Sequence, residues 1–462
     1  MGMYQINFNQ KGHVHFTGIG GISMSALAKI LISEGFTVSG SDSKESELTK
    51  QLCSLGAHIV YEQTSENITP DIDVLVYTAA VKQDNPELTA ARSYSIPVLT
   101  RAELLGQMMK NYKTAICVAG THGKTSTTSM ISQILLEEDS DPTILVGGLF
   151  NAINGNARIG KSDIFITEAC EYTNSFLSFS PTTSIILNVK EDHMDFFKDI
   201  NDIRNSFYKF AHLTPKDGCV VIGSEIDNYS FFTENLECKV LTFGLSTDNS
   251  DFSAVNIKYN NFACAEYDLT EHGKIAAHIE LKVPGEHNVL NSLAAAAACR
   301  NLKISYETIK KGLAKYSGTD RRFQYKGKIN GITIVDDYAH HPDEISATLK
   351  TAKKYPHNSL WCVFQPHTFS RTKAFLKEFA ASLSLSDKVI LADIFPARET
   401  DNLGISSETL YNELKSLGCE AYYLHTFKEI EEFILKNCIN GDLLITMGAG
   451  DVVKIGDELI NK

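Results

Sequence analysis

The stretch KTAICVAGTHGKTSTTSMISQILLEE, residues 113–138, decides the fold. It begins with a short apolar run, continues through a turn that contains two glycines and a lysine, and ends in a longer segment with helical spacing. A strand, a glycine turn and a helix in this order are typical of parallel α/β sheets whose turns hold phosphate groups. We therefore predict that an α/β domain with a nucleotide site begins near Lys113.

The turn offers several groups that can surround a phosphate. Glycines let backbone N–H groups curl around phosphate oxygens, the helix start adds positive potential, a lysine reaches the terminal phosphates, and a hydroxyl can ligate Mg²⁺. The residues of this loop are Gly120, Thr121, His122, Gly123, Lys124, Thr125 and Ser126. Val118 stands where the usual phosphate-loop pattern has its first glycine. A nucleoside triphosphate with Mg²⁺ on Thr125 is the prediction, and a plain glycine turn with a surface lysine is the alternative.

Two more series of alternating strands and helices flank this one. Their apolar segments are residues 13–17, 36–42 and 73–80 in the first series and 331–337, 359–366, 388–395 and 442–448 in the last. Such alternation is the signature of a parallel sheet covered on both faces. We predict three α/β domains, residues 1–112, 113–320 and 321–462. The first and last are expected to be Rossmann-like, and the middle one an ATPase domain with a mostly parallel sheet and an antiparallel addition in residues 216–283.

Composition and charge exclude several classes of protein. The 462 residues are 43% hydrophobic and 21% charged, which is typical of a packed globular chain. The net charge of −13 opposes sequence-independent binding to nucleic acid. The sequence has no secretory signal, no apolar run near the roughly 18 residues of a membrane span, and no zinc-type cysteine cluster. We expect a cytoplasmic protein with reduced thiols that binds neither nucleic acid nor a membrane.

A second glycine turn, Gly18-Ile19-Gly20-Gly21, follows the first apolar segment and resembles a dinucleotide-binding turn. Asp42, at the end of the next segment, has the place of a ribose-binding carboxylate. Ser23 replaces the third glycine, which weakens the case for a nicotinamide dinucleotide. The turn is able to hold the diphosphate of another nucleotide, or it is a tight turn without a ligand.

Polar side chains follow two predicted strands of the middle domain. Glu168 ends one strand, and His193 follows the next. The carboxyl ends of parallel strands gather at one edge of a sheet, so both side chains are expected near the Mg²⁺. A carboxylate oxygen suits Mg²⁺ well, whereas imidazole is a less usual ligand, and His193 is otherwise a capping or surface histidine.

Further polar groups lie near the last domain. Asn288 opens an alanine-rich helix and either pairs with an adenine edge or caps the helix. Arg322, at the proposed domain junction, either reaches a phosphate across a cleft or belongs to a charged linker. Asp337 and His341 follow one strand of the last domain, and Arg371 follows another. A buried strand does not need such groups, so they indicate a site.

Eight motifs in order resemble those of the ATP-dependent peptidoglycan ligases, the Mur ligase family. The motifs are HFTGIGGISMSALA, GTHGKTSTT, EACEY, DHMD, GEHNVLN, SGTDRRF, DDYAHHP and FQPHTFSRT. The resemblance runs from about residue 12 to residue 452. It implies a ligase of peptidoglycan precursor synthesis, and so of cell wall biogenesis, cell shape and cell division. The implied reaction joins L-alanine to the lactyl carboxylate of UDP-N-acetylmuramate through an acyl phosphate made from ATP.

The resemblance also implies roles for individual residues. The implied catalytic residues are Lys124, Glu168, His193 and Arg322, and the implied Mg²⁺ ligands are Thr125, Glu168 and His193. Besides the loop of residues 120–126, the implied ATP contacts are His287, Asn288, Asn291, Arg322 and Asp337. The implied UDP contacts are Gly18, Gly20, Gly21 and Asp42, and the implied contacts to the alanine carboxylate are His341 and Arg371.

Two positions depart from the family pattern. Phe207 stands where some of these ligases carry a carbamylated lysine, and Thr368 stands where some carry a second arginine. Three other hypotheses compete with an L-alanine ligase: a related ligase that attaches a preformed murein peptide to the same nucleotide sugar, a nicotinamide-dependent oxidoreductase, and a nucleotide-gated interaction protein. The oxidoreductase leaves the phosphate loop unexplained. A monomer or a weak homodimer is expected.

Overall fold

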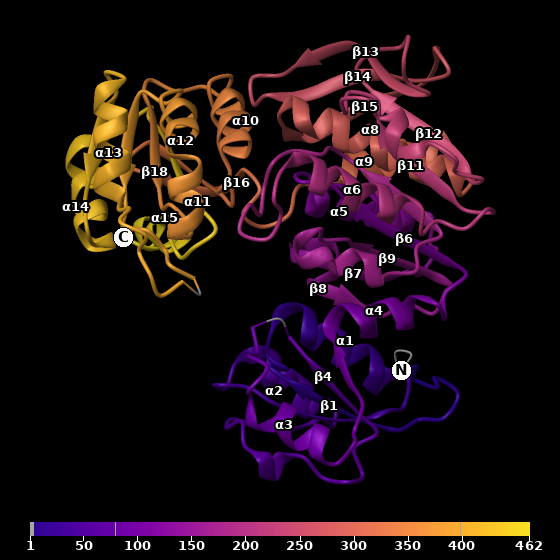
Figure 1. Ribbon diagram of the computed structural model, residues 1–462. Helices are drawn as coiled ribbons and strands as arrows, with labels where there is room; N and C mark the ends of the chain where they lie inside the picture. The colour runs from indigo at the N-terminus through magenta and orange to yellow at the C-terminus, as the bar shows by residue number, and fades with distance from the viewer. Residues whose placement is uncertain (1–3, 79, 398) are drawn as a thin grey trace.

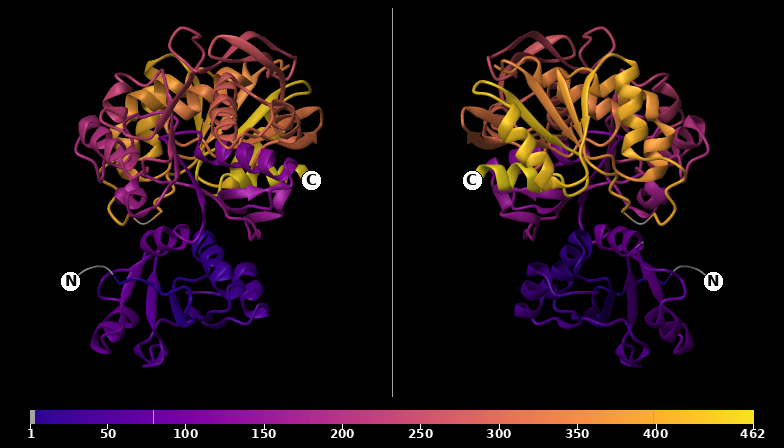
Figure 2. Two further views of the ribbon diagram at one scale, coloured as in Figure 1. Left: turned by 90° about the vertical axis from the view of Figure 1, so that its right-hand side faces the viewer. Right: turned by 90° about the vertical axis from the view of Figure 1, so that its left-hand side faces the viewer.

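The computed structural model describes residues 4–78, 80–397 and 399–462. The chain forms three α/β units, each built on its own sheet (Figure 1). The N-terminal unit stands below the other two (Figure 2), and the central and C-terminal units lie next to each other in the view of Figure 1. The predicted fold class, three α/β domains with mostly parallel sheets, is confirmed.

The N-terminal unit contains a five-stranded parallel sheet in the order β3-β2-β1-β4-β5. Its strands are β1 (His13–Thr17), β2 (Thr37–Ser41), β3 (His58–Val60), β4 (Val74–Tyr77) and β5 (Val98–Thr100). Its helices are α1 (Ile22–Ser33), α2 (Glu47–Ser54), α3 (Pro86–Ser93) and α4 (Arg101–Met109). The predicted apolar face of α1 is buried, since Leu27 and Ile30 have no exposed surface, and Gly35 follows the helix with a φ of +90°. This sheet places the glycine turn of residues 18–21 between β1 and α1.

The central unit contains ten strands in the order β15-β14-β13-β12-β11-β10-β6-β9-β7-β8. Its strands are β6 (Thr114–Ala119), β7 (Thr143–Phe150), β8 (Gly155–Arg158), β9 (Ile164–Glu168), β10 (Thr183–Ile186), β11 (Cys219–Gly223), β12 (Lys239–Gly244), β13 (Phe252–Tyr259), β14 (Cys264–Glu271) and β15 (Lys274–Pro284). Its helices are α5 (Lys124–Glu137), α6 (Ile200–Ala211), α7 (Ser230–Thr233), α8 (Glu286–Asn301) and α9 (Tyr306–Lys315). A 3₁₀ segment, η3 (Tyr172–Ser178), lies between β9 and β10.

One prediction about this sheet is partly wrong. Residues 216–283 do not form a wholly antiparallel addition, because β11 and β12 continue the parallel part of the sheet. In that range only the β13–β14 and β14–β15 pairs are antiparallel. Short alternating segments are compatible with both directions, and the α6 and α7 segments that connect β10, β11 and β12 return the chain to the same edge each time.

The C-terminal unit contains six strands in the order β16-β17-β21-β18-β19-β20, and all pairs except β16–β17 are parallel. Its strands are β16 (Gln324–Ile329), β17 (Ile332–Asp337), β18 (Leu360–Phe364), β19 (Lys388–Leu391), β20 (Glu420–Tyr423) and β21 (Leu443–Met447). Its helices are α10 (Pro342–Ala352), α11 (Phe369–Ala374), α12 (Leu376–Leu383), α13 (Ser407–Ser416), α14 (Phe427–Asn437) and α15 (Val453–Ile460). The edge strand β16 was not predicted, because this short polar segment contains no apolar run.

The N-terminal and central units share part of one apolar core. Leu104 and Met108 of α4 belong to the same buried cluster as Phe176 of η3 and Phe210 of α6. Gly106 lies at the point of closest approach, where a Cβ atom would come within 1.8 Å of the carbonyl oxygen of Ser178. The first unit is therefore held against the second by direct backbone-to-backbone packing.

Two further expectations concern the whole chain. All ten cysteines lie in the described ranges and all are free thiols, as expected for a reduced protein. Within the described ranges, no helix is both long enough and apolar enough to cross a bilayer.

We predict that Gly106→Ala destabilises the protein. The added methyl group overlaps the Ser178 carbonyl group, and overpacking of this kind costs about 1–3 kcal/mol, whereas alanine regains only about 1 kcal/mol of helix propensity. The free energy of unfolding in urea should fall by about 1–2 kcal/mol. Gly155→Ala is the matched control, because a Cβ atom there meets nothing within 4 Å. Equal stability of the two variants would contradict the close approach.

Candidate active site

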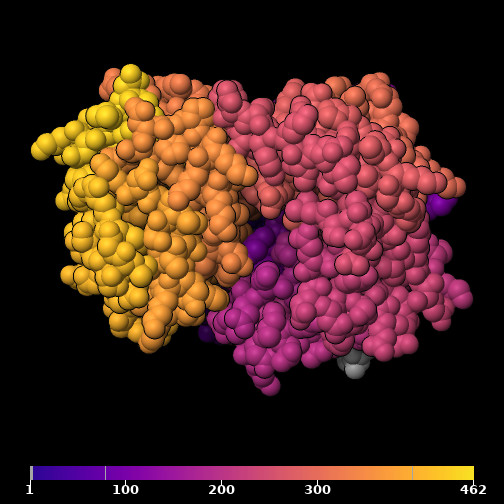
Figure 3. Space-filling model, turned by 90° about the horizontal axis from the view of Figure 1, so that it is seen from above, coloured from indigo at the N-terminus to yellow at the C-terminus, as the bar shows by residue number. Residues whose placement is uncertain are grey.

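The carboxyl ends of neighbouring strands bring the predicted residues together in each sheet. In the central unit β10, β6 and β9 are adjacent and parallel, so the phosphate loop, Glu168 and Asn188 lie at one edge. In the C-terminal unit β17, β21 and β18 are adjacent, which places Asp337 and the segment before Arg371 at one edge. Seen from above, a hollow separates the central and C-terminal units (Figure 3).

The phosphate loop depends on two glycines. Gly120 and Gly123 have φ values of +144° and +86°, which favour glycine strongly. Gly123 also has no room for a side chain, because a Cβ atom would lie 2.5 Å from Oδ1 of Asn291. The loop backbone therefore passes directly beside helix α8, and the start of α5 points toward the same space.

Lys124 is held by oxygen atoms on every side. Its Nζ donates to the backbone carbonyl groups of Gly120 and Thr121 and lies 3.0 Å from Oε2 of Glu171. Burial alone would lower the pKa of Lys124, but the negative charge of Glu171 and of its neighbours raises it above its ordinary value. Lys124 is thus a permanent cation, and Glu171 holds it at the place where a phosphate group would need it.

Thr125 and Glu168 form an oxygen donor set suited to Mg²⁺. The Thr125 hydroxyl donates to Oε2 of Glu168 at 3.0 Å, and the backbone N–H of Gly147 donates to Oε1 at 2.6 Å. A hydroxyl and a carboxylate are the ligands that Mg²⁺ prefers. His193 lies to one side, with Nε2 3.8 Å from Oε1 of Glu171 and its ring 4.6 Å from that of Tyr172. The structure therefore joins Thr125 to Glu168 and places His193 beside Glu171.

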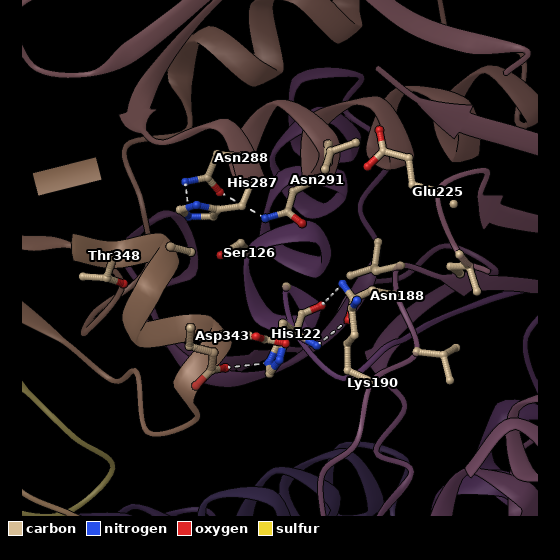
Figure 4. A pocket seen from close by; sticks show the side chains of 18 of the residues that line it. His122, Ser126, Asn188, Lys190, Glu225, His287, Asn288, Asn291, Asp343 and Thr348 are labelled. Atoms are coloured by element: carbon tan, nitrogen blue, oxygen red, sulfur yellow. Dashed lines mark hydrogen bonds and ion pairs between the residues drawn. The ribbon is translucent and has the colours of Figure 1, made fainter. Parts of the chain in front are cut away.

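A cavity of about 520 Å³ lies between the central and C-terminal units. It is lined by all five residues that the resemblance assigns to ATP outside the loop: His287, Asn288, Asn291, Arg322 and Asp337. Figure 4 shows His287, Asn288 and Asn291 on α8 facing Ser126 and His122 of the phosphate loop. The cavity joins the loop to the third domain, as an extended nucleotide requires.

Side chains of this cavity are fixed by hydrogen bonds. Asn288 donates from Nδ2 to the carbonyl oxygen of Pro284 at 2.8 Å and accepts from Asn291 at 3.1 Å. Asp337 accepts the backbone N–H groups of Phe323 and Ala339, each at 2.8 Å. Burial raises the pKa of Asp337 to about 6, although the charge of Arg322 opposes the shift. Asp337 is thus an acceptor of fixed orientation at the C-terminal wall.

The two adjacent arginines at the domain junction have different environments. Arg321 donates to Asp336 at 3.1 Å and to the carbonyl groups of Gly448 and Gly450, so it ties the junction to the third sheet. The Arg322 guanidinium lies over the ring of Tyr338 at 5.3 Å and lines the cavity. Arg322, and not Arg321, therefore lines this cavity.

A second cavity, of about 630 Å³, is lined by residues of all three units. Arg371 crosses it, with Nη2 3.1 Å from Oδ1 of Asp192, and its Nη1 lies 3.4 Å from the ring nitrogen Nδ1 of His367. Burial would raise the pKa of Asp192, but Arg371, His193 and neighbouring histidines hold it well below its ordinary value. Asp192 is a permanent anion that links the central unit to the C-terminal one. Its side chain is buried together with Arg371, at 9% and 12% exposure.

His341 meets the phosphate loop at the same domain border. Its ring lies 5.1 Å from that of His122, whose Nδ1 is 3.1 Å from Oε1 of Glu344. The backbone N–H of Asp343 donates to Nδ1 of His341 at 3.3 Å. A neutral ring that accepts at Nδ1 carries its proton at Nε2, and Nε2 of His341 is buried without a partner among the described residues. His341 can therefore donate to an anion.

The N-terminal glycine turn lies outside the two cavities described above. Gly18 has a φ of +85°, and the backbone N–H of Gly20 donates to Oδ2 of Asp42 at 2.8 Å. The other oxygen of Asp42 accepts the N–H of Ser43 at 2.8 Å. Asp42 thus stabilises the turn itself. Its position in the sequence predicted only a ribose-binding carboxylate. Gly21 is the N-cap residue of α1, and no side chain caps this end of the helix.

Models of the three Mur ligase domains match almost the whole chain. The Mur ligase family catalytic domain covers residues 13–113, the Mur ligase middle domain residues 118–299, and the glutamate ligase domain of Mur ligases residues 321–450. The chain belongs to the Mur ligase family. Its three units follow the order of these family models, and the cavity of about 520 Å³ lies between the second and third units.

Curated relatives and solved structures agree with this membership. A UDP-N-acetylmuramate–L-alanine ligase of Lachnospira eligens is 58% identical over 99% of this chain and 100% of its own, and one of Agathobacter rectalis is 56% identical over the full length of both. The crystal structure of the UDP-N-acetylmuramate–alanine ligase MurC of Thermotoga maritima has a TM-score of 0.81 at 31% identity, over 97% of this chain and 98% of its own. A murein peptide ligase of Psychrobacter arcticus shares the fold, with a TM-score of 0.73 at 24% identity over 97% of this chain and 98% of its own.

Sequence reasoning missed four residues that shape this Mur ligase site. They are Arg101, Glu171, Asp192 and Glu344. Glu171 and Asp192 lie inside the quoted EACEY and DHMD motifs, so the motifs themselves were the available signal. Arg101 and Glu344 carry no local signal, because their importance comes from neighbours distant in the sequence.

We predict that stability falls below pH 6.5 partly through two histidines near Arg371. Burial lowers the pKa of His340 and of His367 to about 4, so between pH 6.5 and 4 the unfolded chain binds protons that the folded protein does not. Each such group contributes stability above pH 6.5 that is lost as the pH falls toward 4, with a slope of about 1.4 kcal/mol per pH unit. Urea unfolding at several pH values should show this slope.

The test compares variants. Between pH 6 and 4.5, His367→Asn should reduce the slope of the unfolding free energy against pH by about 1.4 kcal/mol per pH unit, the contribution of one proton. His425→Asn, at an exposed position, is the matched control and should keep the wild-type slope. The raised pKa of Asp337 has the opposite effect below pH 6, because it stabilises the folded protein as the pH falls. This effect is the same in the wild type and in both variants. A slope unchanged in His367→Asn would disprove the protonation account.

Proposed function

We propose that this Mur ligase joins L-alanine to the lactyl carboxylate of UDP-N-acetylmuramate, with ATP converted to ADP and phosphate. One observation carries the proposal: the cavity of about 630 Å³ is lined by all three units and is linked to the phosphate loop through Glu171. Cys170 and Tyr172 form part of its wall, and Glu171 between them binds Lys124. The full-length relatives named as L-alanine ligases support the choice of substrates.

The chemistry explains why three domains must meet. A carboxylate is a poor acceptor for an amine, because the group that leaves would be oxide. Transfer of the terminal phosphoryl group of ATP gives an acyl phosphate, the amine attacks its carbonyl carbon, and phosphate leaves as the amide forms. The protein must bring two anionic reactants together and hold the amine nearby. Lys124 offsets the negative charge that gathers between them.

For ATP we propose contacts in the cavity of about 520 Å³. The phosphates lie on the loop of residues 120–126, the adenine lies against His287, Asn288 and Asn291, and Asp337 binds the ribose. Arg322 reaches the phosphates from the third domain. Thr125 and Glu168 would hold Mg²⁺, with His193 as a further ligand, and bound Mg²⁺ supplies positive charge that screens the phosphates.

For the other substrates we propose the second cavity and the N-terminal turn. Gly18, Gly20 and Gly21 bind the UDP diphosphate, and Asp42 orders that turn near the uridine. Arg371 and His341 bind the alanine carboxylate, and Asp192 pairs with the Arg371 guanidinium. Domain borders at 112/113 and 320/321, a cytoplasmic location, and a monomer or weak homodimer complete the proposal.

Phosphate release decides between the candidate functions. We predict that ATP with UDP-N-acetylmuramate releases phosphate rapidly only when L-alanine is added, that chelation of Mg²⁺ stops the reaction, and that Lys124→Ala loses at least about 100-fold in kcat, since a preorganised charge at a reacting group contributes this much. The variant should still fold, which circular dichroism checks, although loss of the buried ion pair with Glu171 should lower its melting temperature. Release driven by a murein tripeptide and not by L-alanine would assign the rival ligase activity, and no release with any amine would contradict the proposal.

We predict that Arg371→Ala raises the KM for L-alanine by roughly one to two orders of magnitude. The variant loses a charge-assisted contact that typically contributes about 1.5–3 kcal/mol, and each 1.4 kcal/mol is about tenfold. The KM values for ATP and UDP-N-acetylmuramate should change little, because Arg371 is not among the residues proposed to bind those ligands.

Asp192→Asn separates two roles of Arg371. This variant removes the charge of the 3.1 Å ion pair between the central and C-terminal units but leaves the guanidinium in place. If Arg371 binds alanine, Asp192→Asn should raise that KM much less than Arg371→Ala does. Equal losses for all three substrates in both variants would show that the ion pair only docks the domains.

A further inference from the structure

Three side chains at the border of the central and C-terminal units are arranged like the ligands of a metal ion. His122 belongs to the phosphate loop, His341 is the N-cap residue of α10, and Asp343 lies in the first turn of that helix. One ligand atom from each lies within 4.8 Å of the other two (Figure 4). In the described ranges no other three histidine, cysteine, aspartate or glutamate side chains meet this condition. The cluster shares no residue with the set proposed for Mg²⁺.

Both imidazole rings of the cluster have a buried nitrogen atom without a partner. Among the described residues, Nε2 of His122 and Nε2 of His341 make no hydrogen bond. His341 as a whole is only 5% exposed, and the centres of the two rings are 5.1 Å apart. A buried polar atom without a partner is energetically costly, and such atoms are rare in folded proteins. Two of them at one domain border favour a bound group that both rings contact.

Glu344 fixes the tautomer of His122 in the form that a metal ion needs. Nδ1 of His122 lies 3.1 Å from Oε1 of Glu344. An ionised carboxylate only accepts hydrogen bonds, so Nδ1 carries the proton and Nε2 presents its lone pair. A carboxylate behind the ring is the usual outer partner of a metal-binding histidine, because it orients the ring and makes it more basic.

His341 needs one proton shift to act in the same way. Its Nδ1 accepts the backbone N–H of Asp343 at the long distance of 3.3 Å, so the ring proton is on Nε2. A metal ion on Nε2 would transfer this proton to Nδ1, and the long hydrogen bond would be lost. The ring therefore gives up one weak contact and gains a ligand for its buried nitrogen.

The donor set selects the kind of ion. Two imidazoles and one carboxylate are typical of Zn²⁺ sites with an open fourth position, whereas Mg²⁺ prefers oxygen ligands. Zn²⁺ holds its ligands at about 2.0–2.2 Å, so in a tetrahedron the ligand atoms lie about 3.4 Å apart. Asp343 is exposed, so its side chain can turn toward the two rings. His122 and Asp343 also line the cavity of about 520 Å³, which gives an ion a path to the site.

We propose that His122, His341 and Asp343 bind Zn²⁺, or a similar transition-metal ion, which joins the central unit to the C-terminal unit. One ligand lies on the phosphate loop and two lie on α10, so the ion would hold the two units in the arrangement of this structure. It would also occupy Nε2 of His341, the donor that the proposed function assigns to the alanine carboxylate. Zn²⁺ and L-alanine should then exclude each other, and this consequence alone rests on the proposed function.

The test adds Co²⁺ to the full-length protein, with Mg²⁺ in excess and no substrate present. A four-coordinate Co²⁺ ion absorbs visible light much more strongly than a six-coordinate one, so the spectrum reports the geometry. We expect one strongly absorbing Co²⁺ per chain, which Zn²⁺ displaces. His122→Asn and His341→Asn should abolish the absorption, and Asp343→Asn should weaken it. Glu344→Gln should weaken Co²⁺ binding roughly 10- to 100-fold, as the loss of an outer partner does.

Two further variants are matched controls. His278 is an exposed histidine that lies 2.8 Å from Asp268 and 4.0 Å from Glu280, so His278→Asn removes a similar donor set on the surface. His193→Asn removes the histidine proposed for Mg²⁺. Both variants should keep the Co²⁺ spectrum of the wild type. Asp343→Asn keeps the test decisive if a variant at a buried histidine does not fold, because Asp343 is exposed.

Several results would overturn the inference. They are a wild-type protein without four-coordinate Co²⁺, an unchanged spectrum in Asp343→Asn and in both variants of the cluster histidines, and a spectrum lost in His278→Asn or in His193→Asn. A thiolate charge-transfer band would assign the ion to cysteine and would overturn it as well.

Steady-state kinetics tests the consequence for the amino acid. Zn²⁺ should raise the apparent KM for L-alanine in the wild type, and much less in Asp343→Asn. If Zn²⁺ binds to the cluster without changing this KM, the metal site stands and the proposed role of His341 in alanine binding fails. The two failures are therefore distinguishable, because metal binding is measured without any substrate.

Discussion

Parallel strand pairing is the constraint on which the rest of this structure depends. In a parallel sheet every strand ends at the same edge, so the turns after β10, β6 and β9 must meet. That geometry brings the phosphate loop, Glu168 and Asn188 together, and hydrogen bonds from Thr125 to Glu168 and between His122 and Asn188 then join them. The same constraint acts in the N-terminal sheet on residues 18–21 and Asp42, and in the C-terminal sheet on Asp337 and the segment before Arg371.

Charge balance is the second organising feature. The site must accept several anions, yet in the free protein its cations are neutralised by carboxylates: Lys124 by Glu171 and Arg371 by Asp192. These pairs keep the side chains extended toward the places where substrate oxygens are proposed to bind. A substrate anion therefore competes with Glu171 or Asp192 for these cations. The competition favours ligands that carry several negative charges or that bind together with a cation.

The domain borders carry the chemistry because no single unit holds all the groups it needs. The central unit supplies the phosphate loop, the C-terminal unit supplies Arg322, Asp337 and Arg371, and the N-terminal unit is fixed to the central one through Gly106. The N-terminal border is a packed apolar core, whereas the C-terminal border includes the ion pair between Asp192 and Arg371 and encloses the cavity proposed for the nucleotide. Polar borders of this kind exchange contacts with water and ligands more readily than apolar ones do.

The sequence by itself determined the three α/β units, the phosphate loop and most of the proposed ligand contacts. These features depend on glycine positions, apolar spacing and short motifs, which involve residues that are close together in the sequence. It did not determine the direction of β11 and β12 or the existence of the edge strand β16, since short strands look alike in either direction. Tertiary structure alone decided that Asp192 meets Arg371, that His122 meets His341 and that Arg101 meets Ser23. These pairs are separated by dozens to hundreds of residues. The packing of domains brings the first two pairs within contact distance, and the packing of α1 and α4 in the N-terminal unit brings the third.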